Sequence, residues 1–238
     1  MSTLLLLASA GLGADSWKWT ALPGGFDVVR HEFPGHGSRP VADSPYTLDD
    51  LADEIAANYD GPFHVAGVSM GGMVAQHLLL RHPEKVLSAF LACTAAKVDK
   101  QTMLERAAAS TRGMTGDLIE TTLRRWFSAD VIAQRPSHPG VAHVRHALTT
   151  ITPRSFAAAW SAIADHDVTA HLANVRAPVT CIAADADPAA PPATMKLLAD
   201  AIPGSRLHIL AGPHLLQIER PAEFGAALAA HLALVGVR

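Results

Sequence analysis

The sequence comprises 238 residues, of which 49% are hydrophobic and 17% are charged, and its formal net charge is −3. A chain of this length suits one large domain, or one domain with a sizeable insertion. The apolar content excludes intrinsic disorder. The slightly acidic balance argues against a nucleic-acid partner, because phosphate binding favours a basic surface. The apolar runs are shorter than the ~20 residues of a membrane-spanning helix, so no membrane partner is expected.

The cysteines and the N-terminal segment indicate the cellular compartment in which the protein is expected. Cys93 and Cys181 each lie inside an apolar run, which favours buried free thiols in a reducing compartment. Residues 4–7 are apolar and precede Ala8-Ser9-Ala10, which resembles a signal-peptide cleavage site. However, no Lys or Arg precedes this run, and it is shorter than the ~7–15 apolar residues of a signal peptide. We therefore expect a buried strand here and a cytoplasmic protein.

Short apolar runs alternate with longer amphipathic segments along most of the chain. The apolar runs expected to form strands are residues 3–8, 27–33, 63–68, 86–92, 179–184 and 206–210. The segments expected to form helices between and after them are residues 47–59, 70–81, 192–202 and 221–235. Strands that alternate with helices at this spacing form parallel sheets with right-handed crossovers.

The stretch from Lys97 to about Asn174 interrupts this alternation. It contains no convincing strand, and its pattern predicts helices over residues 100–112, 116–127, 140–150 and 154–164. A helical insertion in a parallel α/β sheet usually covers the carboxyl ends of the strands, where ligands bind. We therefore expect an α/β core formed by residues 1–96 and 175–238, with a helical cap formed by residues 97–174.

The strongest motif is Gly67-Val68-Ser69-Met70-Gly71, which follows an expected strand and opens an expected helix. This is the G-x-S-x-G pattern in the context that a nucleophile elbow requires. The turn is so tight that side chains at Gly67 and Gly71 would collide. The pattern predicts Ser69 as a nucleophile at the carboxyl end of the sheet.

A serine hydroxyl needs a base, and 13 histidines compete for that role. His36 and His214 each follow an expected strand, but in this class of fold the triad order is serine, acid, histidine. His214 satisfies that order and His36 does not. His143 and His146 share a helix face without a nearby third ligand, so no metal site is expected.

The acid is expected between Ser69 and His214, just after a strand. Asp185 and Asp187 both qualify. Asp187 is preferred because it lies on the loop proper, before a proline turn, where it can orient the imidazole. Asp185 remains the alternative.

An oxyanion hole needs two N–H donors. Met70 follows the nucleophile and supplies one. The loop after the first strand, Ala10-Gly11-Leu12-Gly13, is expected to supply the other. Leu12 is the predicted donor.

Several segments together resemble one family, the 3-oxoadipate enol-lactonase group of the α/β-hydrolase superfamily. The matching segments are residues 11–13 with Trp17 or Trp19, 34–38, 67–76, 81–86, 94–97, 125–127, 187–192, His214 and 218–221. The resemblance covers nearly the whole chain and implies an α/β-hydrolase fold, with a mostly parallel sheet and a helical cap insertion. It also places the family's acid on Asp187.

The chain departs from that family in three places. Its first strand corresponds to the third strand of the family sheet, so the usual N-terminal strands are missing. The His-Gly often found before the oxyanion loop is Ala10-Gly11 here. Such lactonases tend to carry an arginine late in the cap, where this chain has Ala164. The resemblance implies that such an arginine would hold a substrate carboxylate.

The sequence thus predicts a serine hydrolase without metal or cofactor that acts on a small carboxylic ester or lactone. The residues expected to contact substrate are Arg125, Trp126, Phe127 and Trp160. Because the cap carries little net charge and position 164 is alanine, the substrate is expected to be partly apolar and not strictly dependent on a carboxylate. The alternatives are a 3-oxoadipate enol-lactonase proper, a lyase or peroxidase-like member of the fold, and a ligand receptor. A homo-oligomer is compatible with the sequence but not indicated by it.

Overall fold

The computed structural model describes residues 1–134 and 138–236. Its centre is a six-stranded, all-parallel sheet with the strand order β2-β1-β3-β4-β5-β6. The strands are β1 (Ser2–Leu7), β2 (Phe26–His31), β3 (Phe63–Val68), β4 (Val86–Ala92), β5 (Val179–Ala184) and β6 (Arg206–Leu210). The predicted parallel α/β sheet is confirmed, and four of the six strands have the predicted bounds.

Burial follows the position of each strand in the sheet. Every residue of β3 and β5 is buried, because helices cover both faces of the central strands. The edge strand β6 has no buried residue, and its residues are exposed or half-buried. The continuous apolar runs in the sequence therefore mark the central strands, where the carboxyl ends position functional loops.

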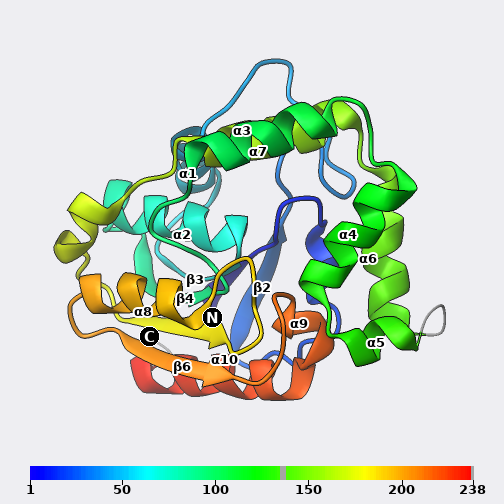
Figure 1. The fold of residues 1–238 in the computed structure, drawn as a ribbon. Helices are drawn as coiled ribbons and strands as arrows, with labels where there is room; N and C mark the ends of the chain where they lie inside the picture. Colours follow the sequence, from blue (N-terminus) through cyan, green and yellow to red (C-terminus); the bar gives the residue numbers. More distant parts are fainter. Residues whose placement is uncertain (135–137, 237–238) are drawn as a thin grey trace.

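The core helices cover the two faces of this sheet (Figure 1). Helices α1 (Leu48–Asn58), α2 (Met70–Arg81) and α8 (Pro192–Ala201) lie on one face, and α10 (Pro221–Val235) lies on the other. Two short elements complete the core: η1 (Ala14–Trp17) lies between β1 and β2, and α9 (Leu216–Glu219) lies between β6 and α10. No helix in the described ranges is both long and apolar enough to cross a membrane.

The chain between β4 and β5 is helical, as predicted. It contains α3 (Lys100–Ser110), α4 (Gly116–Trp126), α5 (Ala129–Ala133), α6 (Pro139–Thr150), α7 (Pro153–Ala164) and η2 (Thr169–Asn174). Helix α3 packs along α7, and α4 packs on α6 (Figure 1). The five-residue α5 was not predicted, because so short a segment shows no helical periodicity.

The two ends of this helical insertion lie side by side. Lys97 and Asp167 form an isolated antiparallel bridge, flanked by backbone bonds from Val98 N to His166 O (3.2 Å) and from Val168 N to Ala96 O (2.9 Å). The two segments that connect the insertion to the sheet are therefore adjacent and hydrogen-bonded to each other. We propose on this basis that residues 97–174 form a separate unit, which we name the cap segment.

Candidate active site

Ser69 stands at the turn between β3 and α2 with φ 56° and ψ −117°. Residues with a side chain rarely adopt this left-handed backbone, so surrounding contacts must hold it. A Cβ at Gly67 would overlap the backbone of Gly71, and a Cβ at Gly71 would overlap the carbonyl of Leu7. The Ser69 amide donates to Ala92 O at 2.9 Å. The glycines let the helix approach β1 closely, and this approach fixes the strained turn.

Asp187 and His214 form a buried pair at the carboxyl ends of β5 and β6. His214 Nδ1 lies 2.7 Å from Asp187 Oδ2, and each residue is only 3% exposed. The amides of Ala189 and Ala190 donate to the other carboxylate oxygen at 2.7 and 3.0 Å. Because a carboxylate only accepts, Nδ1 carries the hydrogen and Nε2 is left as the acceptor. This is the tautomer that a general base requires.

The Asp187 carboxylate is held in its charged form. Burial favours the neutral acid, but the charge of His214 and the hydrogen bonds from His214 and the two amides outweigh burial. The pKa of Asp187 is therefore below its ordinary value. An ionised Asp187 can stabilise an imidazolium that forms on His214.

Of the two acid candidates, the structure brings Asp187 and not Asp185 to His214. Asp185 is exposed and accepts a hydrogen bond from Gly212 N at 2.9 Å, so it supports the loop after β6. His36, the weaker candidate for the base, is buried with its Nδ1 3.0 Å from Pro34 O. It lines a different cavity from Ser69.

Ser69 and His214 line one cavity of about 200 Å³ between the strand ends and the cap segment. Met73, Thr94, Trp126 and Trp160 also line this catalytic cavity. Within the described residues, no hydrogen bond joins Ser69 Oγ to His214. Such bonds often form only when substrate is bound, so the shared cavity wall is the relevant geometry.

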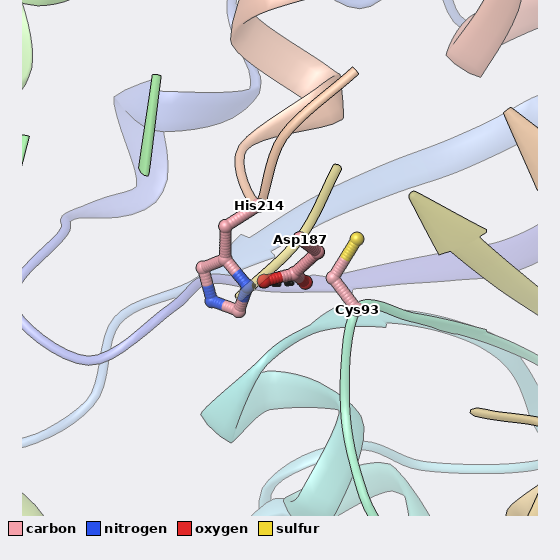
Figure 2. Close-up of side chains that lie close together, drawn as sticks. All are labelled: Cys93, Asp187 and His214. Atoms are coloured by element: carbon pink, nitrogen blue, oxygen red, sulfur yellow. Dashed lines mark hydrogen bonds and ion pairs between the residues drawn. The ribbon is translucent and has the colours of Figure 1, made fainter. Parts of the chain in front are cut away.

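Cys93 lies behind the acid, on the side opposite His214 (Figure 2). It directly follows the last residue of β4 with φ 48°, and its amide donates to Ile182 O of the neighbouring strand at 2.9 Å. Burial, the charge of Asp187 and a hydrogen bond to Asp187 raise the pKa of the Cys93 thiol well above its ordinary value. The neutral thiol therefore supports the carboxylate. Sequence analysis missed this role, because Cys93 showed only as part of an apolar run.

In the described residues, one group of side chains has the spacing of a metal site: Cys93, Asp187 and His214. Their candidate ligand atoms all lie within 4.8 Å of one another. Two of the three are already joined by a short hydrogen bond, and the thiol is held neutral. Metal ligands are the thiolate and an imidazole nitrogen with a free lone pair. The donor set fits an acid–base pair with a supporting thiol better than it fits a metal.

The two predicted oxyanion donors differ in their present bonding. Met70 N stands at the first position of α2, where a helix leaves its N–H groups without intrahelical acceptors. Leu12 N donates to Ser9 O at 3.1 Å within the turn after β1. To bind an oxyanion, the Leu12 amide must leave Ser9 or share its hydrogen between two acceptors.

The predicted substrate contacts divide between two cavities. Trp126, Trp160 and Arg125 line the catalytic cavity. Phe127 lines an outer cavity of about 720 Å³ among α4, α5 and α6, and its ring packs edge-on against His138. Phe127 follows the last residue of α4, so its side chain leaves the helix in a different direction from that of Trp126. Unlike the other three, Phe127 is therefore not part of the wall of the catalytic cavity.

The chain matches the model of the alpha/beta hydrolase family over residues 4–227, and it belongs to that family. It is similar to 3-oxoadipate enol-lactonase 2 of Acinetobacter baylyi, with 29% identity over 94% of this chain and 87% of the relative. It is also similar to the pimeloyl-(acyl-carrier protein) methyl ester esterase of Chromobacterium violaceum, with 27% identity over 87% of this chain and 84% of the relative.

A solved structure agrees with these relatives. The enol-lactonase from Burkholderia xenovorans has a TM-score of 0.92 and 27% identity, and the match covers 98% of this chain and 91% of that chain. The fold is therefore that of the α/β hydrolases. The relatives are named for the hydrolysis of lactones and esters.

Proposed function

We propose that this chain is a serine hydrolase, independent of metals and cofactors, that cleaves a small carboxylic ester or lactone. Ser69 is the nucleophile, His214 the base and Asp187 the acid. The main support is the buried Asp187–His214 pair, whose histidine lines the same cavity as the strained Ser69. The lactonase and esterase relatives support the substrate class.

In the first half-reaction, Ser69 Oγ attacks the carbonyl carbon and its proton passes to His214 Nε2. Asp187 stabilises the imidazolium through Nδ1. The carbonyl oxygen becomes an oxyanion, which accepts hydrogen bonds from Met70 N and, once that amide leaves Ser9, from Leu12 N. The C–O bond of the ester then breaks. His214 returns the proton to the leaving oxygen, and the acyl group stays on Ser69.

In the second half-reaction, water replaces the alcohol. His214 takes a proton from water as its oxygen attacks the acyl carbon. The bond to Ser69 Oγ breaks, and the proton on His214 restores the serine hydroxyl. For a lactone, the leaving oxygen and the released acid belong to one molecule, so the net reaction opens the ring.

The alternatives are a 3-oxoadipate enol-lactonase proper, a lyase or peroxidase-like enzyme, and a ligand receptor. The lactonase relatives support the first of these. Hydrolysis in H₂¹⁸O places one heavy oxygen in the acid product, whereas a lyase leaves the product unlabelled. A receptor binds without turnover.

The direct test is rapid mixing of the protein with 4-nitrophenyl acetate. We expect a burst of nitrophenol that approaches one equivalent, followed by slower turnover, because the acyl-enzyme accumulates. Ser69→Ala should remove the burst and lower kcat by on the order of 10⁴ or more, since triad members act as a unit. A kcat within tenfold of the parent, in a sample free of other esterases, would refute the assignment of Ser69.

We also propose a cytoplasmic location. Cys93 and Cys181 are both free and buried, as a reducing compartment allows.

A further inference from the structure

A series of short polar contacts joins the core to the cap segment beside the catalytic cavity. His77 of α2 has its Nδ1 2.6 Å from Oδ1 of Asp49 on α1. Its other ring nitrogen, Nε2, lies 3.0 Å from Nδ1 of His166 in the cap segment. His166 Nε2 in turn lies 2.8 Å from Ala95 O. Three contacts therefore run through two imidazole rings that the proposed reaction does not use.

His166 stands where the cap segment joins the sheet. Its backbone oxygen accepts from Val98 N at 3.2 Å. We name residues 96–98 and 166–168, which pair across this junction, the cap base. Val98 and Ala95 also line the catalytic cavity, so a movement of the cap base changes the wall of that cavity.

The three contacts need more hydrogens than two neutral imidazoles carry. The Asp49 carboxylate and the Ala95 carbonyl only accept, so His77 Nδ1 and His166 Nε2 must each carry a hydrogen. The contact between the two rings needs another hydrogen, on one nitrogen or the other. Because a neutral imidazole has a single N–H, two neutral rings are one hydrogen short. With all three contacts made, the pair therefore contains one imidazolium.

The surrounding charges place the extra proton on His77. Burial lowers the pKa of His77, and the hydrogen bond and charge of Asp49 oppose this effect. Arg81 of α2 also lowers this pKa, and Asp53 of α1 raises it. The pKa of His77 is below its ordinary value, so the pair is neutral at high pH and takes up its proton as the pH falls.

His166 is the less suitable ring for the charge. Burial lowers its pKa to about 4, against the bond to Ala95 O, and the charge of His77 lowers it further. The nearest carboxylate of the cap base, Asp167, raises this pKa but is already paired with Lys97 Nζ at 2.7 Å. A cationic His77 can donate from Nε2 to a neutral His166, which keeps its own hydrogen on Nε2.

Loss of the extra proton weakens the hold on His166 in particular. The hydrogen on His77 Nδ1 stays, because the charged Asp49 is the strongest acceptor of the three contacts. The missing hydrogen is then that of the ring–ring contact or that of the contact with Ala95 O. Both of these contacts join His166 to the core, and two acceptors that face each other repel. Ala95 O keeps a partner in either case, since Gln76 Nε2 donates to it at 3.0 Å.

We propose that His77 and His166 form a proton-dependent latch between the core and the cap segment. With one proton added to the pair, both ring nitrogens of His166 are bonded to the core, and the cap base is closed. With the pair neutral, one of these bonds is lost, and the cap base opens more often and admits ligands to the cavity more readily. The latch itself does not depend on the reaction assigned to Ser69.

The first test measures the protonation of both rings. Nitrogen-15 NMR of histidine-labelled protein distinguishes the two neutral tautomers from imidazolium, and His77→Leu and His166→Leu assign the signals. As the pH falls from about 8 to about 5, the range in which histidines titrate, His77 should become cationic. His166 should then carry its hydrogen on Nε2. A hydrogen on His166 Nδ1 beside a cationic His77 would overturn the latch, and so would a His77 that stays neutral throughout.

The second test measures how often the cap base opens. The amides of Val98 and Val168 donate across it, to His166 O and Ala96 O. Their protection from hydrogen exchange, corrected for the intrinsic effect of pH, should rise at least about threefold as His77 takes up its proton, because one more hydrogen bond holds the closed form. Protection that does not change through this transition would overturn the latch.

Variants separate a proton-dependent latch from ordinary packing. Asp49→Asn keeps an oxygen that accepts from His77 Nδ1 but removes the charge, so the rise in protection should move to lower pH by about half a unit or more. His77→Leu cannot bond to His166, so protection should keep its low value at every pH. His82→Gln is the matched control: His82 also contacts a carboxylate of α1, with Nε2 2.7 Å from Asp53 Oδ1, but forms no described hydrogen bond or ion pair with the cap segment.

The midpoint of the rise in protection is the decisive readout, because a merely structural contact does not shift it. A midpoint that stays in place in Asp49→Asn, with folding verified by circular dichroism, would refute the role of the His77 charge. A midpoint displaced equally by His82→Gln would assign the proton to another site.

Turnover tests the link between the latch and the cavity. The ratio of kcat/KM in the parent to that in His77→Leu cancels the titration of His214, which both proteins share. For a neutral nitrophenyl ester, this ratio should be close to one at high pH and fall to about a third or less once His77 is cationic. A constant ratio would overturn the effect on the cavity. If the exchange results hold but neither protein hydrolyses the ester, the latch stands and the hydrolase assignment fails.

Discussion

Trp126 of the cap segment stacks on the imidazole of His214, with ring centroids 6.2 Å apart and planes inclined by 24°. The Leu215 amide also donates to Trp126 O at 3.3 Å, so backbone and side chain both tie the end of α4 to the loop that carries His214. The cap segment therefore does more than cover the cavity. It holds one face of the proposed catalytic base.

The stacking predicts a difference between two adjacent aromatic residues. Trp126→Leu should lower kcat by tenfold to about a hundredfold, because a displaced base loses alignment with Ser69. Phe127→Leu should leave kcat within threefold, since Phe127 faces the outer cavity. Steady-state kinetics on both variants, with melting temperatures as a control for folding, measures this. Equal losses would show that the stacking on His214 has no catalytic role.

The two neighbouring carboxylates allow a matched test of the proposed acid. Asp187→Asn should lower kcat by about 10⁴, because an amide can hold His214 in the wrong tautomer. Asp185→Asn should cost less than tenfold, since the Asp185 carboxylate accepts from the Gly212 amide and lies away from His214 in the described contacts. Initial rates with one chromogenic ester decide the order. The reverse ranking would move the acid to Asp185, and two small effects would exclude both residues.

The sequence predicted the features that depend on local pattern. The apolar runs located the strands, and the glycines around Ser69 located the elbow, because both signals lie within about ten residues. The features it missed depend on contacts between distant segments. Cys93 reaches Asp187 because β4 and β5 are neighbours in the sheet. Arg106 reaches the catalytic cavity because α3 packs along α7.

Other features could not be predicted because they depend on the direction in which one side chain or one backbone amide points. The pattern could not separate Trp126 from Phe127, because the end of α4 decides which side chain faces His214. Likewise, the hydrogen bond from Leu12 N to Ser9 O depends on the backbone conformation of a turn, and the sequence of a turn has no periodic pattern that would predict it.

Because α2 approaches β1 closely at Gly71, we predict that the nucleophile elbow does not tolerate a side chain at this position. Gly71→Ala should destabilise the protein by more than the ~1–3 kcal/mol typical of overpacking, because the added methyl would overlap the Leu7 carbonyl, which cannot move aside. Gly116→Ala is the control: it begins α4 with nothing within 4 Å of the added Cβ. Urea unfolding should show little change there, or a gain of up to about 1 kcal/mol. Similar stability of the two variants would contradict this account of the elbow.

Three buried histidines predict how stability depends on pH. The pKa of His31, of His166 and of His231 is lowered to about 4, in each case chiefly by burial. The charges of Arg39, His77 and His64, respectively, also lower them. At pH 7 these side chains are neutral in both the folded and the unfolded protein. As the pH falls below about 6.5, the unfolded chain binds protons that the folded protein refuses, so stability falls until the folded pKa near 4 is reached.

The test is the slope of the free energy of unfolding between pH 6.5 and 4, measured by urea denaturation. Each buried histidine contributes up to about 1.4 kcal/mol per pH unit in this window. His231→Gln should remove about one such contribution, whatever its effect on stability at pH 7.5, because glutamine does not titrate. His208→Gln, at an exposed position on β6, should leave the slope close to that of the parent. A slope unchanged by His231→Gln would mean that His231 takes up its proton in the folded protein as readily as in the unfolded chain.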